Sequence, residues 1–205
     1  MLNYKVTIEP ENLPVSLSEV KSHLRVCTPA EDAQIERYYI PAATRVIEQD
    51  LNRKLITQTM ELILDDFPDS DQILLPGGSI QSIVGITYYD EDGVEQTLST
   101  ADYIQGLDFE PARIIKAPDA TWPTVRSTYG PKPVVVTYVA GYGDNPADVP
   151  ATIRQAILLT VAHYYYNREA VVTGTIATEL PQGVKYLIEA ERVGDDFSDY
   201  EGGLL

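Results

Sequence analysis

The chain has 205 residues and a formal net charge of −16, which excludes general affinity for nucleic acid or anionic membranes, because phosphate binding needs lysine and arginine. Hydrophobic residues make up 44% of the chain and charged residues 22%, proportions that exclude wholesale disorder. The single cysteine, Cys27, excludes an intramolecular disulfide framework and a multi-cysteine zinc site.

The beginning of the chain predicts an extended arm followed by a short helix. Residues 1–15 contain two prolines, and we expect them to be extended. Ser16 and Glu19 have the spacing of a capping box, in which each side chain bonds the backbone N–H of the other residue. Apolar residues then recur at helical spacing, so a helix is expected to begin at Ser16.

A second, longer helix is predicted from Thr28 to about Arg53. Thr28 would cap it, and Pro29 suits the first helical position because its missing N–H costs nothing there. Glu31 would close a second capping box. Pro41 lies inside the apolar periodicity, so we expect a kink or a break at that point.

The middle third predicts an antiparallel β-layer of about five or six strands. Alternating apolar residues over 57–64 and 134–139 are typical of strands. Residues 80–89 and 94–98 flank Asp90-Glu-Asp-Gly93, and an Asp-Gly pair favours a tight hairpin turn. Shorter strands are predicted at residues 73–75, 103–104 and 113–115.

Helical character returns after Pro150. Residues 151–168 are apolar on almost every side, which indicates a helix that is covered on almost every side. An α+β domain of this size can cover such a helix internally, but a subunit interface would do so more easily. A short helix is expected to follow Pro181. The candidates for the subunit interface are Ile153, Ile157, Leu158, Val161, Tyr164 and Tyr165.

No sequence motif predicts catalytic, metal or cofactor chemistry. Gly141-Tyr-Gly143 begins like a dinucleotide-binding fingerprint, but Pro146 stands where the third glycine belongs, so a strand-ending turn is the better interpretation. The acids of residues 65–71 could gather a divalent ion, and a solvated loop is favoured over that reading. Cys27 precedes a helix start but has no partner histidine nearby, so no catalytic role is predicted for it.

No export or membrane segment is predicted either. The N-terminus lacks a basic region followed by an apolar core, so it does not resemble a signal peptide. The most apolar run, residues 156–162, is far shorter than the roughly 20 residues that a spanning helix needs. The expected compartment is a cytoplasm, or a particle assembled in one.

The expected fold class is α+β, with a helical core and an inserted antiparallel β-layer. The helices occupy about residues 16–54 and 150–190, and the β-insertion about residues 56–143. We expect residues 1–192 to form a single domain. Residues 193–205 are expected to form an acidic tail.

The order of several segments carries a family resemblance. These segments are 15–25, Glu31-Asp32, 50–59, 74–76, 80–88, the Asp-x-Asp-Gly turn at 90–93, 136–143, 149–159 and 166–169. In this order they resemble the head–tail connector (adaptor) proteins of tailed bacteriophages. The resemblance spans about residues 15–192, and the chain departs from it at Pro41 and in the acidic extension after Arg192.

This resemblance implies a structural virion protein without enzymatic activity or cofactor. About twelve copies would form a ring below the portal protein, extend the DNA channel and offer the tail its attachment surface. The implied location is the virion neck, assembled in the cytoplasm of a bacterial host. The implied partners are the portal protein and a tail-completion or tail-terminator protein, whereas double-stranded DNA would pass without specific binding and no membrane would be involved.

Two sets of residues become candidates for this role. An acidic channel wall would repel DNA phosphates, and its candidates are Asp90, Glu91, Asp92 and Glu95. Apolar and aromatic residues in the acidic tail could anchor it on the portal, and these are Phe197, Tyr200, Leu204 and Leu205. Two alternatives stay open: another virion assembly component, such as a tail-completion protein, and an enzyme that binds a metal through acidic residues.

Overall fold

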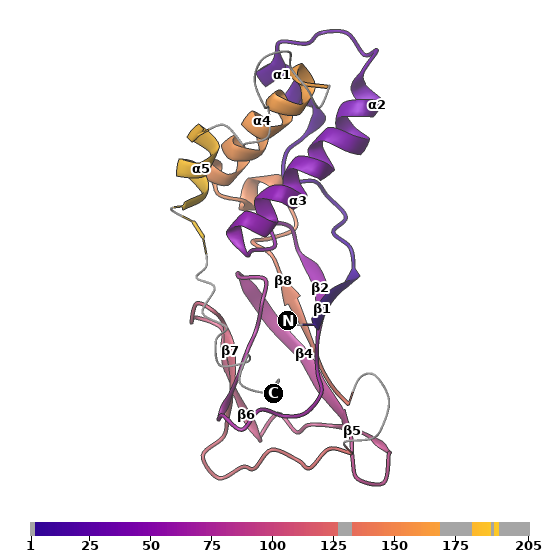
Figure 1. Ribbon diagram of the computed structural model, residues 1–205, viewed down its shortest axis with the longest axis vertical. Helices are drawn as coiled ribbons and strands as arrows, with labels where there is room; N and C mark the ends of the chain where they lie inside the picture. The colour runs from indigo at the N-terminus through magenta and orange to yellow at the C-terminus, as the bar shows by residue number, and fades with distance from the viewer. Residues whose placement is uncertain (1–2, 127–132, 169–181, 190, 193–205) are drawn as a thin grey trace. The chain divides into compact units, whose positions relative to one another are not determined.

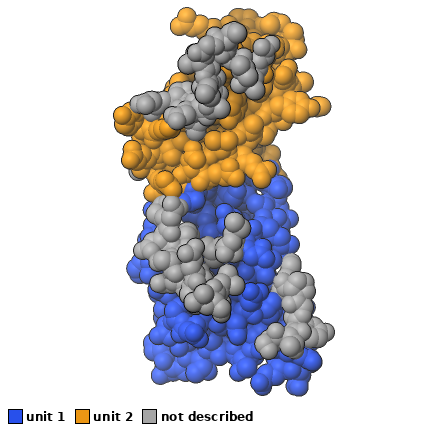
Figure 2. All heavy atoms as spheres, in the orientation of Figure 1, with its two compact units in different colours: residues 1–10, 52–142, 193–205 blue, residues 11–51, 143–192 orange. Residues whose placement is uncertain are grey.

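In a computed structural model, the described residues are 3–126, 133–168, 182–189 and 191–192 (Figure 1). They belong to two compact units (Figure 2). A β unit contains residues up to Pro10 together with residues 52–142, and a helical unit contains residues 11–51 and 143–192. The α+β class with an inserted β region is therefore confirmed.

The β unit contains a five-stranded and a three-stranded antiparallel sheet. The strands of the larger sheet, in spatial order, are β1 (Asn3–Ile8), β2 (Gln58–Leu64), β8 (Val134–Ala140), β4 (Ile80–Tyr89) and β5 (Glu95–Thr97). Those of the smaller sheet are β3 (Gln72–Leu74), β7 (Arg113–Lys116) and β6 (Tyr103–Gly106). The predicted hairpin, short strands and inserted antiparallel β-layer are confirmed, but the described strands outnumber the expected five or six and form two sheets.

The first strand was expected to be an extended arm. Residues of β1 are extended, as expected, but they pair with β2 from Asn3↔Ile63 to Ile8↔Thr59 and form one edge of the larger sheet. Most β1 side chains are exposed, so apolar alternation is too weak to reveal the strand. The backbone ladder, rather than a buried face, holds β1 in place.

Both sheets contribute to one hydrophobic core. Its fully buried members come from five strands and the segment after β3: Met60, Leu62, Ile73, Leu75, Ile86, Ile114, Val134, Val136, Tyr138 and Ala140. The hydroxyl of Tyr138 donates to the carbonyl oxygen of Pro76 at 2.9 Å, which satisfies the one polar atom of this side chain. Burial raises the pKa of the Tyr138 phenol far above its ordinary value, so it stays a donor at all physiological pH values.

In the described part of the chain, the helical unit contains four helices of eight or more residues and three shorter helical turns. The elements are α1 (Leu17–Leu24), α2 (Asp32–Gln34), the π-helical turn η1 (Ile35–Tyr39), α3 (Ile40–Leu51), the 3₁₀ turn η2 (Pro146–Asp148), α4 (Ala151–Tyr166) and α5 (Gln182–Glu189). Among the described residues, none of the helices has the length and apolar character required to cross a membrane.

The two predicted capping boxes have different outcomes. Ser16 caps α1 as predicted: its hydroxyl accepts from the N–H of Glu19, and the Glu19 carboxylate accepts from the N–H of Ser16 at 2.9 Å. The second box is wrong, because α2 begins at Asp32 and its N-cap is Glu31 without a side-chain bond to the cap. The Glu31 carboxylate instead accepts hydrogen bonds from Tyr165 of α4 and from Arg168, which lies just after α4.

At Pro41, where a kink or a break was expected, the helical segment continues without a break but is preceded by a π-helical turn. The turn just before it is π-helical, and the N–H of Ile40 donates to the carbonyl oxygen of Ile35, one residue further back than in an α-helix. Proline supplies no N–H to the helical ladder, and a wider turn accommodates the gap without ending the helix. The helix continues as α3 and ends at Leu51, two residues before the predicted Arg53.

Candidate assembly surfaces

Helix α4 is the centre of the helical unit. Its stripe of Ile153, Ala156, Ile157, Thr160 and Val161 is buried, and α4 packs against α1, α3 and α5. Thr160 satisfies its own hydroxyl by donating to the carbonyl oxygen of Ala156 at 2.8 Å. The chain's own helices therefore cover one stripe of the apolar helix.

This burial corrects half of the predicted subunit interface. Ile153, Ile157 and Val161 have at most 1% of their surface exposed, so they are core residues and offer no contact area to another copy. The physical reason is that α1, α3 and α5 supply the cover that a neighbouring subunit was expected to supply. Leu158, Tyr164 and Tyr165 are half-buried and keep part of their surface for a partner.

Tyr165 lies in an aromatic and charged cluster at the C-terminal end of α4. Its hydroxyl donates to Glu31, and its ring meets that of Tyr39 edge-to-face with centroids 6.3 Å apart. The Arg168 guanidinium lies 5.0 Å from the Tyr165 ring centroid and forms an ion pair with Glu31. These contacts join the start of α2 to the end of α4.

The charges of this cluster reinforce one another. The hydrogen bond from Tyr165, followed by that from Arg168, lowers the pKa of the Glu31 carboxyl below its ordinary value. The same hydrogen bond to Glu31 raises the pKa of the Tyr165 phenol. Glu31 therefore stays ionised and Tyr165 stays protonated at neutral pH, which keeps the donor and acceptor roles fixed.

A second polar link joins α1 to α4. Arg154 of α4 donates to the Glu19 carboxylate, which also caps α1 through Ser16. The Ser16 backbone hydrogen bond is the largest cause, and Arg154 adds to it, in lowering the pKa of Glu19. One carboxylate thus serves as both a cap and an interhelical contact.

The predicted acidic hairpin forms, and its acids have different roles. Asp90 accepts from the N–H groups of Val94 at 2.8 Å and Asp92 at 3.1 Å, and from the Gln96 amide at 2.8 Å. These bonds, led by that of Val94, lower the pKa of Asp90. Asp90 is therefore a turn-forming residue, whereas Glu91, Asp92 and Glu95 are exposed.

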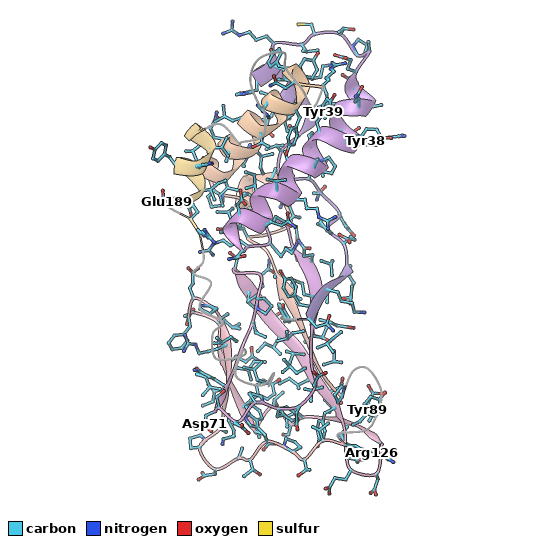
Figure 3. The ribbon with its side chains drawn as sticks, in the orientation of Figure 1. Tyr38, Tyr39, Asp71, Tyr89, Arg126 and Glu189 are labelled. Atoms are coloured by element: carbon cyan, nitrogen blue, oxygen red, sulfur yellow. The ribbon has the colours of Figure 1, made fainter. Side chains whose placement is uncertain are left out.

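Strand register brings a second acidic loop to the same end of the larger sheet. Leu64 at the end of β2 and Tyr88 near the end of β4 both pair with Val134 at the start of β8. The loop that follows β2 and the hairpin that follows β4 therefore leave the sheet at one end. Figure 3 shows Asp71 and Tyr89 at this end of the β unit. Exposed carboxylates of the loop, Asp65, Asp66 and Asp69, thus join those of the hairpin, a grouping that sequence spacing did not reveal.

The remaining predicted residues divide into two groups. The portal-docking candidates Phe197, Tyr200, Leu204 and Leu205 lie outside the described residues. Cys27 is exposed and free. Within the described part of the chain, no group of three or more histidine, cysteine, aspartate or glutamate side chains could hold a metal ion.

Comparison with known proteins gives a family and several similar structures. The profile of the head completion protein family matches residues 15–179. A chain from the virion of a native gene transfer agent particle is similar in fold, with a TM-score of 0.76 and 25% identity over 93% of this chain and 95% of that one. No curated protein sequence matches.

Two further similar chains come from necks of such particles. The neck of an empty particle, computed with C6 symmetry, contains a chain with a TM-score of 0.73 and 28% identity over 95% of this chain and 96% of that one. The neck of a native particle, computed with C12 symmetry, contains a chain with a TM-score of 0.69 and 26% identity over the same shares.

Proposed function

This chain belongs to the head completion protein family, and from that membership we infer that it is a structural head–tail connector of a virion neck. The observation that carries this function is the match to neck chains along 95% of the sequence, so the likeness includes both the β unit and the helical unit. The predicted role, location and bacteriophage-like virion class agree with it.

We propose that about twelve copies form a closed ring. The C6 and C12 symmetries of the similar necks support a homo-oligomeric ring, and C12 supports the number twelve. A closed ring repeats one contact around an axis, so each copy uses two different surfaces to meet its two neighbours. Leu158, Tyr164 and Tyr165 remain candidates for this contact because each keeps exposed surface.

We also propose that the acidic end of the β unit faces passing DNA. Glu91, Asp92 and Glu95 are exposed there, and the loop after β2 adds further carboxylates. Repeated around a ring, these charges would repel phosphates over about 8 Å at physiological salt. DNA would then move through without specific binding. Asp90 would contribute charge as well as holding the hairpin turn.

The acidic tail is proposed to dock on the portal protein. Residues 193–205 contain four acids and no lysine or arginine, and Phe197, Tyr200, Leu204 and Leu205 supply apolar anchors. A tail-completion or tail-terminator protein would bind the opposite side of the ring. No enzymatic role is proposed, and the similar chains belong to virions.

Mass measurement on the mixed proteins tests the ring and the docking together. The full chain mixed with the portal protein of its own particle is expected to give a portal complex heavier by about twelve chains, as a C12 neck would require. Deleting residues 193–205 is expected to abolish docking and leave the circular dichroism spectrum unchanged. A full chain that stays separate from its portal protein would contradict the function, and unchanged docking after the deletion would contradict the role of the tail.

A further inference from the structure

In a ring of strongly acidic chains, cations placed where copies meet reduce the repulsion between neighbours. Each chain has a formal net charge of −16, and a cation of one copy that faces a carboxylate of the next gives the contact complementary charge. Several lysines and arginines form ion pairs within the chain, namely Lys5, Lys21, Arg53, Lys116, Arg154 and Arg168. Arginines that form no such ion pair with the described residues are therefore candidates for contacts between copies.

Two of these arginines lie on one exposed helical face. Arg37 of η1 and Arg45 of α3 are exposed and form no ion pair with any described residue. Between them lie three other exposed residues, Tyr38, Pro41 and Ala42. We call these five residues the arginine flank. Tyrosine and arginine are both enriched in protein interfaces.

The arginine flank has a prominent aromatic. Tyr38 has 67% of its surface exposed, although it belongs to a turn whose Ile35 is fully buried. The π-helical geometry of η1 shifts the residues before Pro41 relative to α3, and Figure 3 shows Tyr38 pointing away from the helices. The exposed tyrosine, beside arginine, is therefore available to a binding partner.

The opposite side of the helical unit offers a complementary surface. On α5, Val184 and Ile188 are buried, so the helix turns Gly183, Lys185, Tyr186 and Glu189 outward. We call these four residues the α5 flank. Tyr186 is 71% exposed, Lys185 already makes an interaction within its own chain, and Glu189 forms no ion pair with any described residue. In Figure 3, Glu189 and Tyr38 lie on opposite sides of the helical unit.

We propose that the arginine flank of one copy binds the α5 flank of the next copy in the neck ring. Rotational symmetry keeps both surfaces at one height and brings opposite sides of neighbouring copies together. The contact would pair Arg37 with Glu189 and pack Tyr38 near Tyr186. This inference rests on the proposed ring and names one pair of surfaces that takes part in the contact between copies.

Charge exchange between the flanks tests the contact directly. Arg37→Glu alone and Glu189→Arg alone each place like charges across the interface, so the amount of ring on the portal protein is expected to fall about tenfold or more. The double variant R37E/E189R restores opposite charges and is expected to regain the wild-type ring. Arg25→Glu is the matched control, because Arg25 is exposed and without an ion pair to described residues but lies outside both flanks.

The readout is the mass of each variant mixed with the portal protein, with circular dichroism to verify folding. Single variants that assemble like the wild type would overturn the proposal. Loss without recovery in the double variant would also overturn it, as would an equal loss in Arg25→Glu, which would assign the effect to net charge. If the wild type itself forms no ring, the proposed function fails and this contact fails with it.

Discussion

Glu19 contributes both to the N-cap of α1 and to the contact between α1 and α4. Its carboxylate accepts from the Ser16 N–H and hydroxyl and from Arg154, and these bonds lower its pKa. A lowered folded-state pKa means that the carboxylate stabilises the fold fully above the ordinary glutamate pKa of about 4.3. That stabilisation is lost as the pH falls through the lower, folded-state pKa.

Glu19→Gln is therefore expected to lower the free energy of unfolding at pH 7 by about 0.5–1 kcal/mol, because the pair with Arg154 is partly exposed and screened. The difference from the wild type should shrink as the pH falls below about 4, where the wild-type carboxylate becomes protonated. Urea unfolding at several pH values measures it, with exposed Glu36→Gln as the control. A difference that stays constant with pH would contradict the role of the charge.

Gly141 follows β8 in a conformation that other residues rarely adopt. Its φ is +131°, and an added Cβ would lie 2.6 Å from the carbonyl carbon of Ile56 and from the nitrogen of Thr57. We expect Gly141→Ala to lower the free energy of unfolding by more than about 2 kcal/mol. Gly85→Ala is the control, because its Cβ would meet nothing within 4 Å, and it should change stability by less than about 0.5 kcal/mol. Equal effects in thermal unfolding would contradict the steric explanation.

At the scale of elements, the β4–β5 hairpin depends on Asp90. Asp90→Ala removes the acceptor for the Val94 and Asp92 N–H groups and is expected to cost about 1 kcal/mol. Asp92→Ala changes the same net charge at an exposed position and should cost much less. Chemical denaturation of both variants measures the difference. If the two variants lose equal stability, the carboxylate of Asp90 does not hold the turn.

Sequence patterns predicted most elements because local chemistry determines them. The Ser16 box, the Asp-Gly hairpin and the apolar run of β8 need only neighbours in sequence, and each appears as expected. Predictions failed where a contact depends on residues that are far apart in the sequence. The Glu31 carboxylate is held by Tyr165 and Arg168, which lie more than 130 positions away.

The number of sheets also depends on distant contacts. β3, β6 and β7 are short strands whose sequences indicate extended backbone but not their partners. Only strand pairing separates them from the larger sheet, while side chains of both sheets share one core. The same reasoning explains the α4 correction: an apolar helix needs cover, and the pattern does not say whether that cover comes from its own chain or from another copy.

At the scale of the whole molecule, the acidic end of the β unit is expected to keep DNA moving. A triple variant with Glu91→Lys, Asp92→Lys and Glu95→Lys reverses exposed charge without touching the Asp90 hydrogen bonds to Val94. Portal-bound rings of this variant should bind duplex DNA at low salt and release it as the salt concentration rises, while wild-type rings should not bind. Filter binding across salt concentrations measures it. Wild-type rings that retain DNA would contradict a repelling surface.

The candidate surfaces were only partly predictable from the sequence. Acidic residues and apolar anchors can be counted, but register is needed to place the loop after β2 beside the hairpin. The sequence does not show which cations form ion pairs within the chain, and so it does not show which exposed arginines are available to a neighbouring copy. Family membership indicates the function, whereas burial and ion pairing within the chain indicate which surfaces are available for contacts with other molecules.

The most direct test of the central claim is a reconstruction of the neck of the particle that carries this chain, computed with and without imposed symmetry. We expect a closed ring of about twelve copies between the capsid vertex and the tail, as in the similar C12 neck. A neck that lacks this chain, or a chain located elsewhere in the particle, would contradict its assignment as the connector.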